Sequence, residues 1–268
     1  MTDLRGADLR AMRAFALSDK GRVRAENEDN FLSKPQTGLF AVADGMGGHA
    51  AGATASAVVI DSLSRVAPQG AAAELRRQCE AALQGAHRDI QRQAALRGVA
   101  TMGSTVVMLL TFDRYYACLW AGDSRAYLLR GGDIVQITID HTEAEQLLAD
   151  GVLTPEEARN WPRRNVITRA VGAGETLALD FVNGELFEGD MFVLCSDGLT
   201  GHVAAAEIAG LACGRAPEEA CRALIDLALA RGGTDNVTAL VAAYRQQEEE
   251  PTRLRPGREE SRETTRPR

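Results

Sequence analysis

The sequence lacks any apolar run long enough to cross a membrane. About 20 consecutive apolar residues are needed to span a bilayer, and no stretch of the 268 residues approaches that length. The first thirteen residues contain Asp3, Arg5, Asp8 and Arg10, where an export signal would have an uninterrupted apolar segment. We therefore expect no membrane partner and a cytoplasmic location.

The sequence also lacks an even number of cysteines, which a full set of disulfides would need, and it has no excess of basic residues. The cysteines are five in number and never spaced as CxxC, which favours a reducing, cytosolic compartment. Lys and Arg number 30 against 37 Asp and Glu, so the formal charge is −7. Because binding to nucleic-acid phosphates needs a basic surface, we expect no nucleic-acid partner. A P-loop nucleotide site is excluded as well, since GxxxxGK[ST] does not occur.

What is present is the composition of a soluble globular domain, 45% apolar and 25% charged. Residues 246–268 differ from this composition, because Leu254 is their only large apolar residue. We predict that this charged tail is disordered. Residues 1–11 are interpreted as an N-terminal lead and 12–245 as one folded domain.

Short β-type runs alternate with alanine-rich helical runs along the domain. The links at 111–115 and 130–133 are short and turn-like, which predicts antiparallel hairpins. Helices flanking an antiparallel sheet on both sides would bury the apolar faces, so we predict an α+β fold. The expected strands are 13–17, 39–43, 105–111, 115–120, 126–129, 134–137, 191–195 and 237–243. The expected helices are 49–65, 71–96, 204–212 and 217–231, and 141–174 reads as a helix-containing excursion.

Aspartates recur at the ends of the expected strands. Asp44, Asp123 and Asp197 each follow an apolar strand, and Asp235 stands just before the last one. Carboxylates that converge at one sheet edge need a positive partner, and their hard oxygens suit Mg²⁺ or Mn²⁺. An Asp followed by Gly is also a common turn, so on this pattern alone a metal site and a purely structural role are equally open.

Six motifs in a fixed order narrow the choice. They are SDKGRVRAENEDNF at 18–31, ADGMGGHAAG at 43–52, MGST at 102–105, AGDSR at 121–125, CSDGL at 195–199 and GTDN at 233–236. Over about 12–245 the chain resembles the bacterial form of the metal-dependent serine/threonine protein phosphatases of the protein phosphatase 2C (PPM) family. The resemblance implies a four-layer α-β-β-α sandwich, in which two packed antiparallel sheets are flanked by helices, with a flap at about 141–174. It also implies hydrolysis of phosphoserine and phosphothreonine by a metal-activated water.

The same resemblance implies roles for individual residues. Two Mn²⁺ or Mg²⁺ ions would be held by four carboxylates and one main-chain carbonyl: Asp29, Asp44, Asp197, Asp235 and the carbonyl of Gly45. Glu28 would hold metal-bound water. Arg24 would bind the substrate phosphate, in a bidentate manner that lysine cannot provide.

Two positions depart from the family pattern. Asp123 resembles the ligand of a weak third metal, but the second carboxylate of that site is replaced by Gly201. Met46 stands where animal members carry a histidine proposed to protonate the leaving group. We expect a metal-bound water to take that role and rank His49 second.

The implied partners are phosphorylated Ser/Thr proteins and a cognate Ser/Thr kinase whose action the chain would oppose, including kinases linked to type VI secretion. The protein is expected to be a monomer. Arg163, Arg164 and Arg169 in the flap are candidates for attracting a phosphoprotein, with plain surface charge as the alternative. Two rival functions stay open: a catalytically silent phosphoprotein-binding pseudophosphatase, and a phosphatase of a partner-switching regulator.

Overall fold

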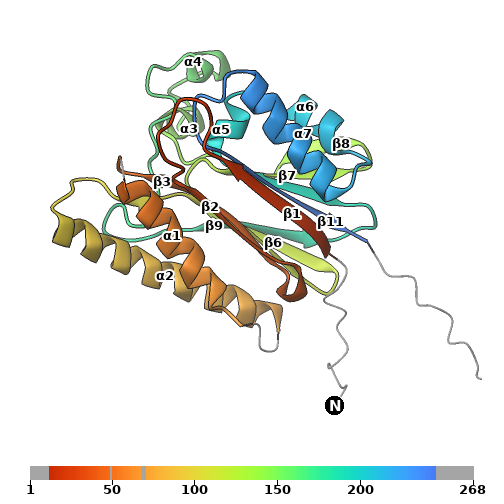
Figure 1. Cartoon of the computed structure of the whole chain (residues 1–268), viewed down its shortest axis with the longest axis horizontal. Helices are drawn as coiled ribbons and strands as arrows, with labels where there is room; N and C mark the ends of the chain where they lie inside the picture. The colour runs from red at the N-terminus through yellow and green to blue at the C-terminus, as the bar shows by residue number, and fades with distance from the viewer. Residues whose placement is uncertain (1–11, 49, 68–70, 246–268) are drawn as a thin grey trace, which may run out of the picture.

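Two antiparallel β-sheets pack against each other at the centre of the molecule (Figure 1). The computed structural model describes residues 12–48, 50–67 and 71–245. The first sheet has five strands in the order β1 (Met12–Asp19), β11 (Val237–Tyr244), β10 (Met191–Cys195), β7 (Arg125–Arg130) and β8 (Asp133–Gln136). Its neighbours are paired antiparallel throughout.

The second sheet has six strands. Its main path runs through β2 (Asp29–Lys34), β3 (Leu39–Met46), β5 (Val106–Phe112), β6 (Tyr115–Ala121) and β9 (Asp180–Glu185). The short strand β4 (Gly103–Ser104) pairs with the end of β3. The two predicted hairpins are present, as β5–β6 and β7–β8.

Central strands are apolar on both faces, because each sheet packs against the other sheet on one face and against helices on the other. Along Leu39–Ala43 at the start of β3, no residue exceeds 1% exposure. Phe40 and Val42 face the other sheet, where they join Leu194 and Leu240, while Leu39 packs under the helices. Burying one such side chain contributes roughly 1.5–3 kcal/mol, and the contact between the two sheets is one of the three buried cores of the described residues.

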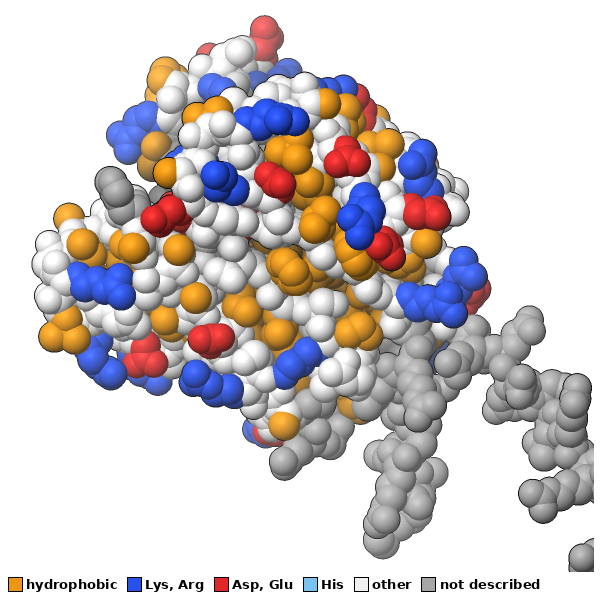
Figure 2. All heavy atoms as spheres, viewed as in Figure 1, with side chains coloured by type: hydrophobic (Ala, Val, Ile, Leu, Met, Phe, Trp, Pro, Cys, Tyr) orange, Lys and Arg blue, Asp and Glu red, His pale blue; other side chains and the backbone are white. Residues whose placement is uncertain are grey.

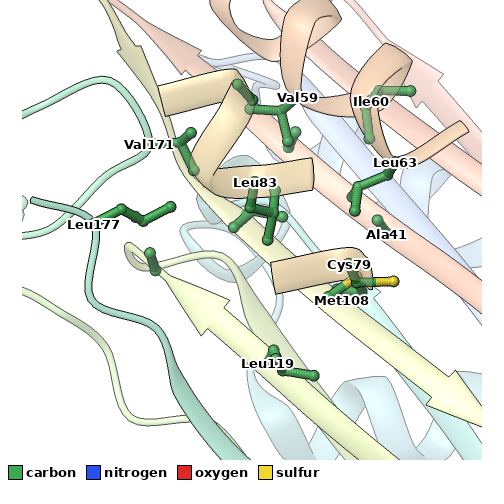
Figure 3. Close-up of a cluster of buried hydrophobic side chains, with 14 of the residues drawn as sticks. Ala41, Val59, Ile60, Leu63, Cys79, Leu83, Met108, Leu119, Val171 and Leu177 are labelled. Carbon is green, nitrogen blue, oxygen red and sulfur yellow. The ribbon is translucent and has the colours of Figure 1, made fainter. Parts of the chain in front are cut away.

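Helices α1 (Ala50–Ser64) and α2 (Ala72–Arg97) cover the outer face of the six-stranded sheet (Figure 1). Val59 and Leu63 of α1 and Leu83 of α2 meet Met108 of β5 in the core shown in Figure 3. Small residues on α1 let the helix lie close to β3. The first turns of α1 are therefore held beside the end of β3, where the candidate site begins.

The five-stranded sheet is covered by α5 (Asp197–Thr200), α6 (Ala205–Ala212) and α7 (Pro217–Ala230) (Figure 1). Leu224 and Ile225 of α7 pack on Val241 of β11. These layers confirm the predicted α+β sandwich of two antiparallel sheets flanked by helices.

The flap projects from one end of the sandwich and contains α3 (Glu143–Ala149) and α4 (Pro155–Arg159) (Figure 1). Its two ends are tied together by an antiparallel bridge between Thr142 and Ile167. A second bridge, between Ser104 and Val171, fastens its return to the six-stranded sheet. The predicted helix-containing excursion is thus a closed loop with a fixed base.

Elements that the sequence pattern did not predict are β2, β4, β9 and the single-turn helix α5. The residues of β9 alternate between half-buried and exposed, and this strand forms an edge of its sheet. At the opposite edge, β2 carries the polar sequence DNFLSK. Because β2 and β9 each contain exposed and half-buried residues, their sequences lack the continuous apolar run that identified the central strands.

The exterior of the domain is mixed in charge. On the face shown in Figure 2, basic and acidic side chains are interspersed over all the layers. Within the described ranges, no helix is long and apolar enough to cross a membrane. The predicted lead 1–11 and tail 246–268 lie outside the described residues.

Candidate metal centre

The strand register brings two of the predicted ligands together. Asp29, the first residue of β2, is the antiparallel partner of Asp44 on β3. Side chains of directly opposed residues have Cβ atoms about 4.5–5.5 Å apart. The two carboxylates therefore lie next to each other at the end of the six-stranded sheet.

The facing sheet supplies two more carboxylates at the same end. Asp197 begins α5, separated from β10 by one residue. The pKa of Asp44 is raised by burial, then by the charge of Asp29 and by that of Asp197, so the carboxyl groups of Asp44 and Asp197 lie close together. Asp235 precedes β11, and a Cβ placed on Gly198 would lie 3.4 Å from the Asp235 side chain. The structure thus brings Asp29, Asp44, Asp197 and Asp235 to one edge of the sandwich.

Asp29 is oriented by two buried hydroxyl groups. Ser196 Oγ donates to Asp29 Oδ2 at 2.8 Å, and Thr238 Oγ1 donates to the same oxygen at 2.7 Å. Asp29 is only 5% exposed. Its other oxygen, Oδ1, is buried and has no hydrogen-bond partner in the described part of the chain. A buried carboxylate oxygen left in this way is suited to a cation, because burying it unpaired costs free energy.

Burial and mutual repulsion disfavour the ionised forms of these carboxyl groups. Burial raises the pKa of Asp29 to about 6, against the bonds from Thr238 and Ser196. Burial, followed by the charge of Asp29, raises the pKa of Asp44 well above its usual range. The pKa of Asp197 is also raised, by burial and then by the charge of Asp235. A divalent ion among them would reverse this effect.

Arg24 provides a positive charge at this edge. Its Nη2 donates to Asp235 Oδ2 at 2.6 Å, and this pair raises the pKa of Arg24. Among the residues that the structure describes, no group of three Asp, Glu, His or Cys side chains is close enough together to bind one metal ion. In this structure Asp235 faces Arg24.

Gly45 and Glu28 are fixed by close approach of the main chain. Gly45 N–H donates to the carbonyl of Glu28 at 3.1 Å, and a Cβ on Gly45 would collide with the carbonyl oxygen of Gly52 in α1. A Cβ on Gly52 would lie 2.8 Å from Glu28 Oε1. Two glycines thus allow β3, α1 and the Glu28 side chain to meet at this point.

Asn236 holds the loop that carries Arg24. Its Nδ2 donates to the carbonyls of Lys20 and Glu26, each at 2.9 Å, and its Oδ1 accepts from Glu28 N–H at 2.8 Å. Sequence reasoning missed Asn236, Ser196 and Thr238 as positioning residues. The available signal was adjacency, since Ser196 precedes Asp197 and Asn236 follows Asp235.

Asp123 lies in the turn between β6 and β7, close enough to Asp44 and Asp197 for their charges to interact. It is buried, and burial, followed by the charges of Asp197 and Asp140, raises its pKa to about 7. Gly201 offers no side chain beside it. Asp140 is held by Arg125, whose Nε and Nη2 donate to it at 2.6–3.0 Å. Asp123 is therefore left without the second carboxylate that the family pattern places beside it. The third metal site stays a prediction.

A cleft of about 600 Å³ separates this edge from the flap. Asp123, Asp197 and Gly201 line one side, and α3 and α4 line the other. The remaining predicted residues fall elsewhere. Met46 is half-buried at the end of β3, opposite Gly103 of β4. His49 lies outside the described residues, so its predicted role is not placed.

The three flap arginines differ in their surroundings. Arg163 pairs with Glu143 at 2.9 Å and Arg169 pairs with Asp180 at 2.7 Å. Arg164 lines the cleft together with Arg159, which the sequence reading did not single out. The three therefore do not form one common patch.

One family model and several known proteins are similar to this chain. A family model described as protein phosphatase 2C matches residues 21–211. The serine/threonine protein phosphatase PstP of Mycobacterium tuberculosis is 39% identical over 234 residues, which cover 86% of this chain and 45% of that protein. The structure resembles that of PppA, a key regulatory component of the type VI secretion system in Pseudomonas aeruginosa, at 40% identity and a TM-score of 0.82, covering 87% and 98% of the two chains. The catalytic domain of PstP in complex with two manganese ions is 37% identical, with a TM-score of 0.78 over 88% and 99% of the chains.

Proposed function

Because the chain belongs to the protein phosphatase 2C family, we propose that it is a metal-dependent protein serine/threonine phosphatase. The resemblance stated from the six motifs is confirmed at the level of the family. The chain spans about half the length of the Mycobacterium tuberculosis relative, at 45%. The observation that carries the proposal is the buried Oδ1 of Asp29, which has no hydrogen-bond partner among the described residues, at the edge where three further aspartates gather.

The proposed cofactors are two Mn²⁺ or Mg²⁺ ions. The donors that fit them are all oxygens, which these ions prefer: the carboxylates of Asp29, Asp44, Asp197 and Asp235 and the carbonyl of Gly45. Such ions would lower the pKa of water and neutralise charge on a phosphoryl group. In support, a related catalytic domain was solved with two manganese ions. Glu28, held against Gly52, is proposed to orient water at the edge of this centre.

Arg24 is the proposed binding group for the substrate phosphate. Its side chain is 51% exposed, so a phosphate can reach it from solvent. A guanidinium can hold two phosphate oxygens at once, which fixes the phosphorus relative to the carboxylate cluster. To do so Arg24 would turn from Asp235, leaving that carboxylate to the metal ions. We propose that substrate and metal thereby replace the Arg24–Asp235 pair.

The leaving group of the substrate needs a proton donor. The thioether of Met46 cannot donate a proton, so the side chain after Asp44-Gly45 takes no part in this step. We propose that water at the centre takes this role, with His49 as the second candidate. No phosphorylated cysteine is required, and four of the five cysteines are buried.

The proposed substrates are proteins phosphorylated on serine or threonine, and the proposed partner is the kinase that modifies them. A structural relative is named as a regulatory component of type VI secretion, which supports a pathway of that kind for this chain. Free cysteines support the proposed cytoplasmic location. A monomer is proposed because the domain buries its apolar clusters within one chain.

Phosphate release from phosphothreonine and phosphotyrosine peptides tests the proposal. The wild type should require Mn²⁺ or Mg²⁺, prefer phosphothreonine and stop in EDTA. Asp197→Asn should nearly abolish turnover, whereas Asp226→Asn, at an exposed position on α7, should not change it. Equal turnover in EDTA would refute a metal-dependent mechanism.

The rival functions make different predictions in the same assay. A pseudophosphatase would bind the phosphothreonine peptide and release no phosphate in any metal. All four aspartates and Arg24 are present, which favours the enzyme. A phosphatase of a partner-switching regulator would hydrolyse the intact phosphorylated regulator far faster than short phosphothreonine peptides.

A further inference from the structure

The cleft between the metal centre and the flap has two basic residues on its flap side. Arg159 ends α4, and Arg164 follows in the loop that returns to the base of the flap. Building on the proposed phosphatase function, we infer that this cleft binds acidic side chains beside the phosphorylated residue of the substrate, with Arg159 and Arg164 as the residues that determine this specificity. The preferred substrates are therefore acidic phosphopeptide segments.

The two arginines are distinguished from their neighbours by being unpaired. Glu143 accepts from Arg163 at 2.9 Å and from Trp161 Nε1 at 3.0 Å, so its carboxylate is already engaged. Across the described ranges, neither Arg159 nor Arg164 has an ion pair. An unpaired guanidinium at a cleft wall can bind a carboxylate without first losing an internal partner.

Charge in the cleft favours an acidic ligand once the neighbouring acids are accounted for. Asp140 is neutralised by its bidentate contact with Arg125. Asp123 and Asp197 line the wall at the metal centre, opposite α3 and α4, and Asp197 is a proposed metal ligand. On the flap side this leaves Glu145 against two arginines. The cleft is thus basic where it faces away from the metal centre.

The opposite wall has room for a peptide because of Gly201. A side chain at this position would point toward the cleft that Gly201 lines, and a carboxylate there would repel an acidic ligand. The volume of about 600 Å³ lies within the range of about 300–1,000 Å³ typical of ligand sites. A single phosphate would fill little of it, so flanking residues of a peptide fit better than a second phosphate.

The flap presents its arginines from a fixed scaffold. Thr154 and Glu157 form a capping box at the start of α4, with Glu157 N–H donating to Thr154 Oγ1 and Thr154 N–H donating to Glu157 Oε2 at 2.8 Å. Trp161, through its bond to Glu143, ties the following loop to α3. Groups held in place before binding lose less conformational entropy when a ligand arrives.

Phosphothreonine peptides that differ at one position test the inference. Each position from three before to three after phosphothreonine would carry Glu, Ala or Lys in turn, and kcat/KM would be measured with Mn²⁺. At one or more positions the wild type should prefer Glu to Lys by about tenfold, as expected for charge-assisted hydrogen bonds. Equal rates at every position would overturn the inference.

Charge reversal assigns the preference to these residues. In R159E and R164E the ratio of Glu to Lys peptides should fall to one or below, whereas R215A, at an exposed arginine outside the cleft, should keep the wild-type ratio. Both peptides meet the same enzyme preparation, so partial misfolding cancels from the ratio. An unchanged ratio in both reversal variants would overturn the inference.

The proposed function fails in a distinguishable way. If the wild type releases no phosphate even from an aryl phosphate with Mn²⁺, the phosphatase proposal itself is wrong. If it hydrolyses the aryl phosphate and every peptide without a charge preference, only the cleft inference is wrong.

Discussion

His141 and Gly122 are joined by two hydrogen bonds. His141 N–H donates to the carbonyl of Gly122 at 2.9 Å, and Gly122 N–H donates to His141 Nδ1 at 3.2 Å. Because Nδ1 accepts, the neutral imidazole carries its proton on Nε2, which lies 3.2 Å from Asp180 Oδ2. His141 thereby links the first residue of the flap to the turn that carries Asp123.

Replacing His141 should loosen that turn. His141→Leu leaves the buried Gly122 N–H without its acceptor, which should lower the free energy of unfolding by about 1–3 kcal/mol. His141→Asn should recover part of this loss, since its Oδ1 can accept in place of Nδ1. Urea unfolding of the three proteins measures the difference. Equal losses in both variants would show that the acceptor is unimportant.

The same histidine predicts a pH dependence. Burial lowers the pKa of His141 below its usual value of about 6.5. The unfolded chain then binds a proton at a higher pH than the folded chain does. The stability that His141 contributes is therefore full above about pH 6.5 and is lost as the pH falls through its folded pKa. The stability difference between wild type and His141→Asn should shrink as the pH falls below about 6.5.

Asp29 should make the metal-free protein less stable as pH rises. Its folded pKa of about 6 exceeds the unfolded value of about 3.9, so its contribution is full below about pH 4 and is lost toward pH 6. Asp29→Asn keeps an oxygen acceptor for Ser196 and Thr238 but cannot ionise. In EDTA the variant should gain roughly 2–3 kcal/mol over the wild type between pH 4 and 7.

Manganese should reverse the order of these two proteins. At pH 7 added Mn²⁺ should raise the Tm of the wild type and leave that of Asp29→Asn nearly unchanged, because a ligand stabilises only the state that binds it. Asp226→Asn should respond as the wild type does. A similar Mn²⁺ response in Asp29→Asn would show that Asp29 is not a ligand.

Arg24 should matter for its fork-shaped geometry as well as its charge. Arg24→Lys keeps the charge and loses the bidentate contact, so kcat/KM for a phosphothreonine peptide should fall by about 10- to 100-fold. Arg22→Ala is the matched control, since Arg22 is in the same loop and bonds to the carbonyl of Leu229 at 2.9 Å. Steady-state kinetics that fail to separate the two variants would remove Arg24 from the proposed mechanism.

Gly201 predicts the number of ions that the protein binds. With Asp140 held by Arg125, the wild type should bind two Mn²⁺ per chain. Gly201 has helical backbone angles, φ −65° and ψ −20°, which any residue can adopt, and a Cβ there would lie 3.2 Å from the carbonyl oxygen of Asp197, which must shift slightly. Gly201→Asp should add a third ion, whereas Gly210→Asp on α6 should not. Calorimetric titration gives the counts, and a third ion in the wild type would contradict the prediction.

The central strands and long helices could be predicted because their apolar pattern follows from burial. Met191–Cys195 is fully buried and coincides with its predicted strand. Strands β2 and β9 could not, because polar residues interrupt the apolar pattern of DNFLSK and DFVNGE, whereas the edge strand β1 keeps enough apolar residues to be predicted. Their positions depend on pairing between distant segments, such as β6 with β9.

The candidate site divides in the same way. The motifs grouped Asp29, Asp44, Asp197 and Asp235, and the structure places them at one edge; their role as ligands stays a prediction. The hydroxyls of Ser196 and Thr238 that orient Asp29 come from β10 and β11. This contact depends on how the two sheets pack against each other, so it cannot be predicted from the residues near Asp29 in the sequence. For the same reason the sequence could not predict that Arg163 pairs with Glu143 while its neighbour Arg164 lines the cleft.

The bridge between Thr142 and Ile167 closes the flap into a loop that leaves and rejoins the sandwich at one place. Residues 143–166 lie between the two bridged residues, so changes in this segment leave the register of the sheet strands unaltered. Under the proposed function, substitutions in this insert would change the contacts made with a substrate protein. The chemistry beneath it, built on strands that the insert never enters, is left intact.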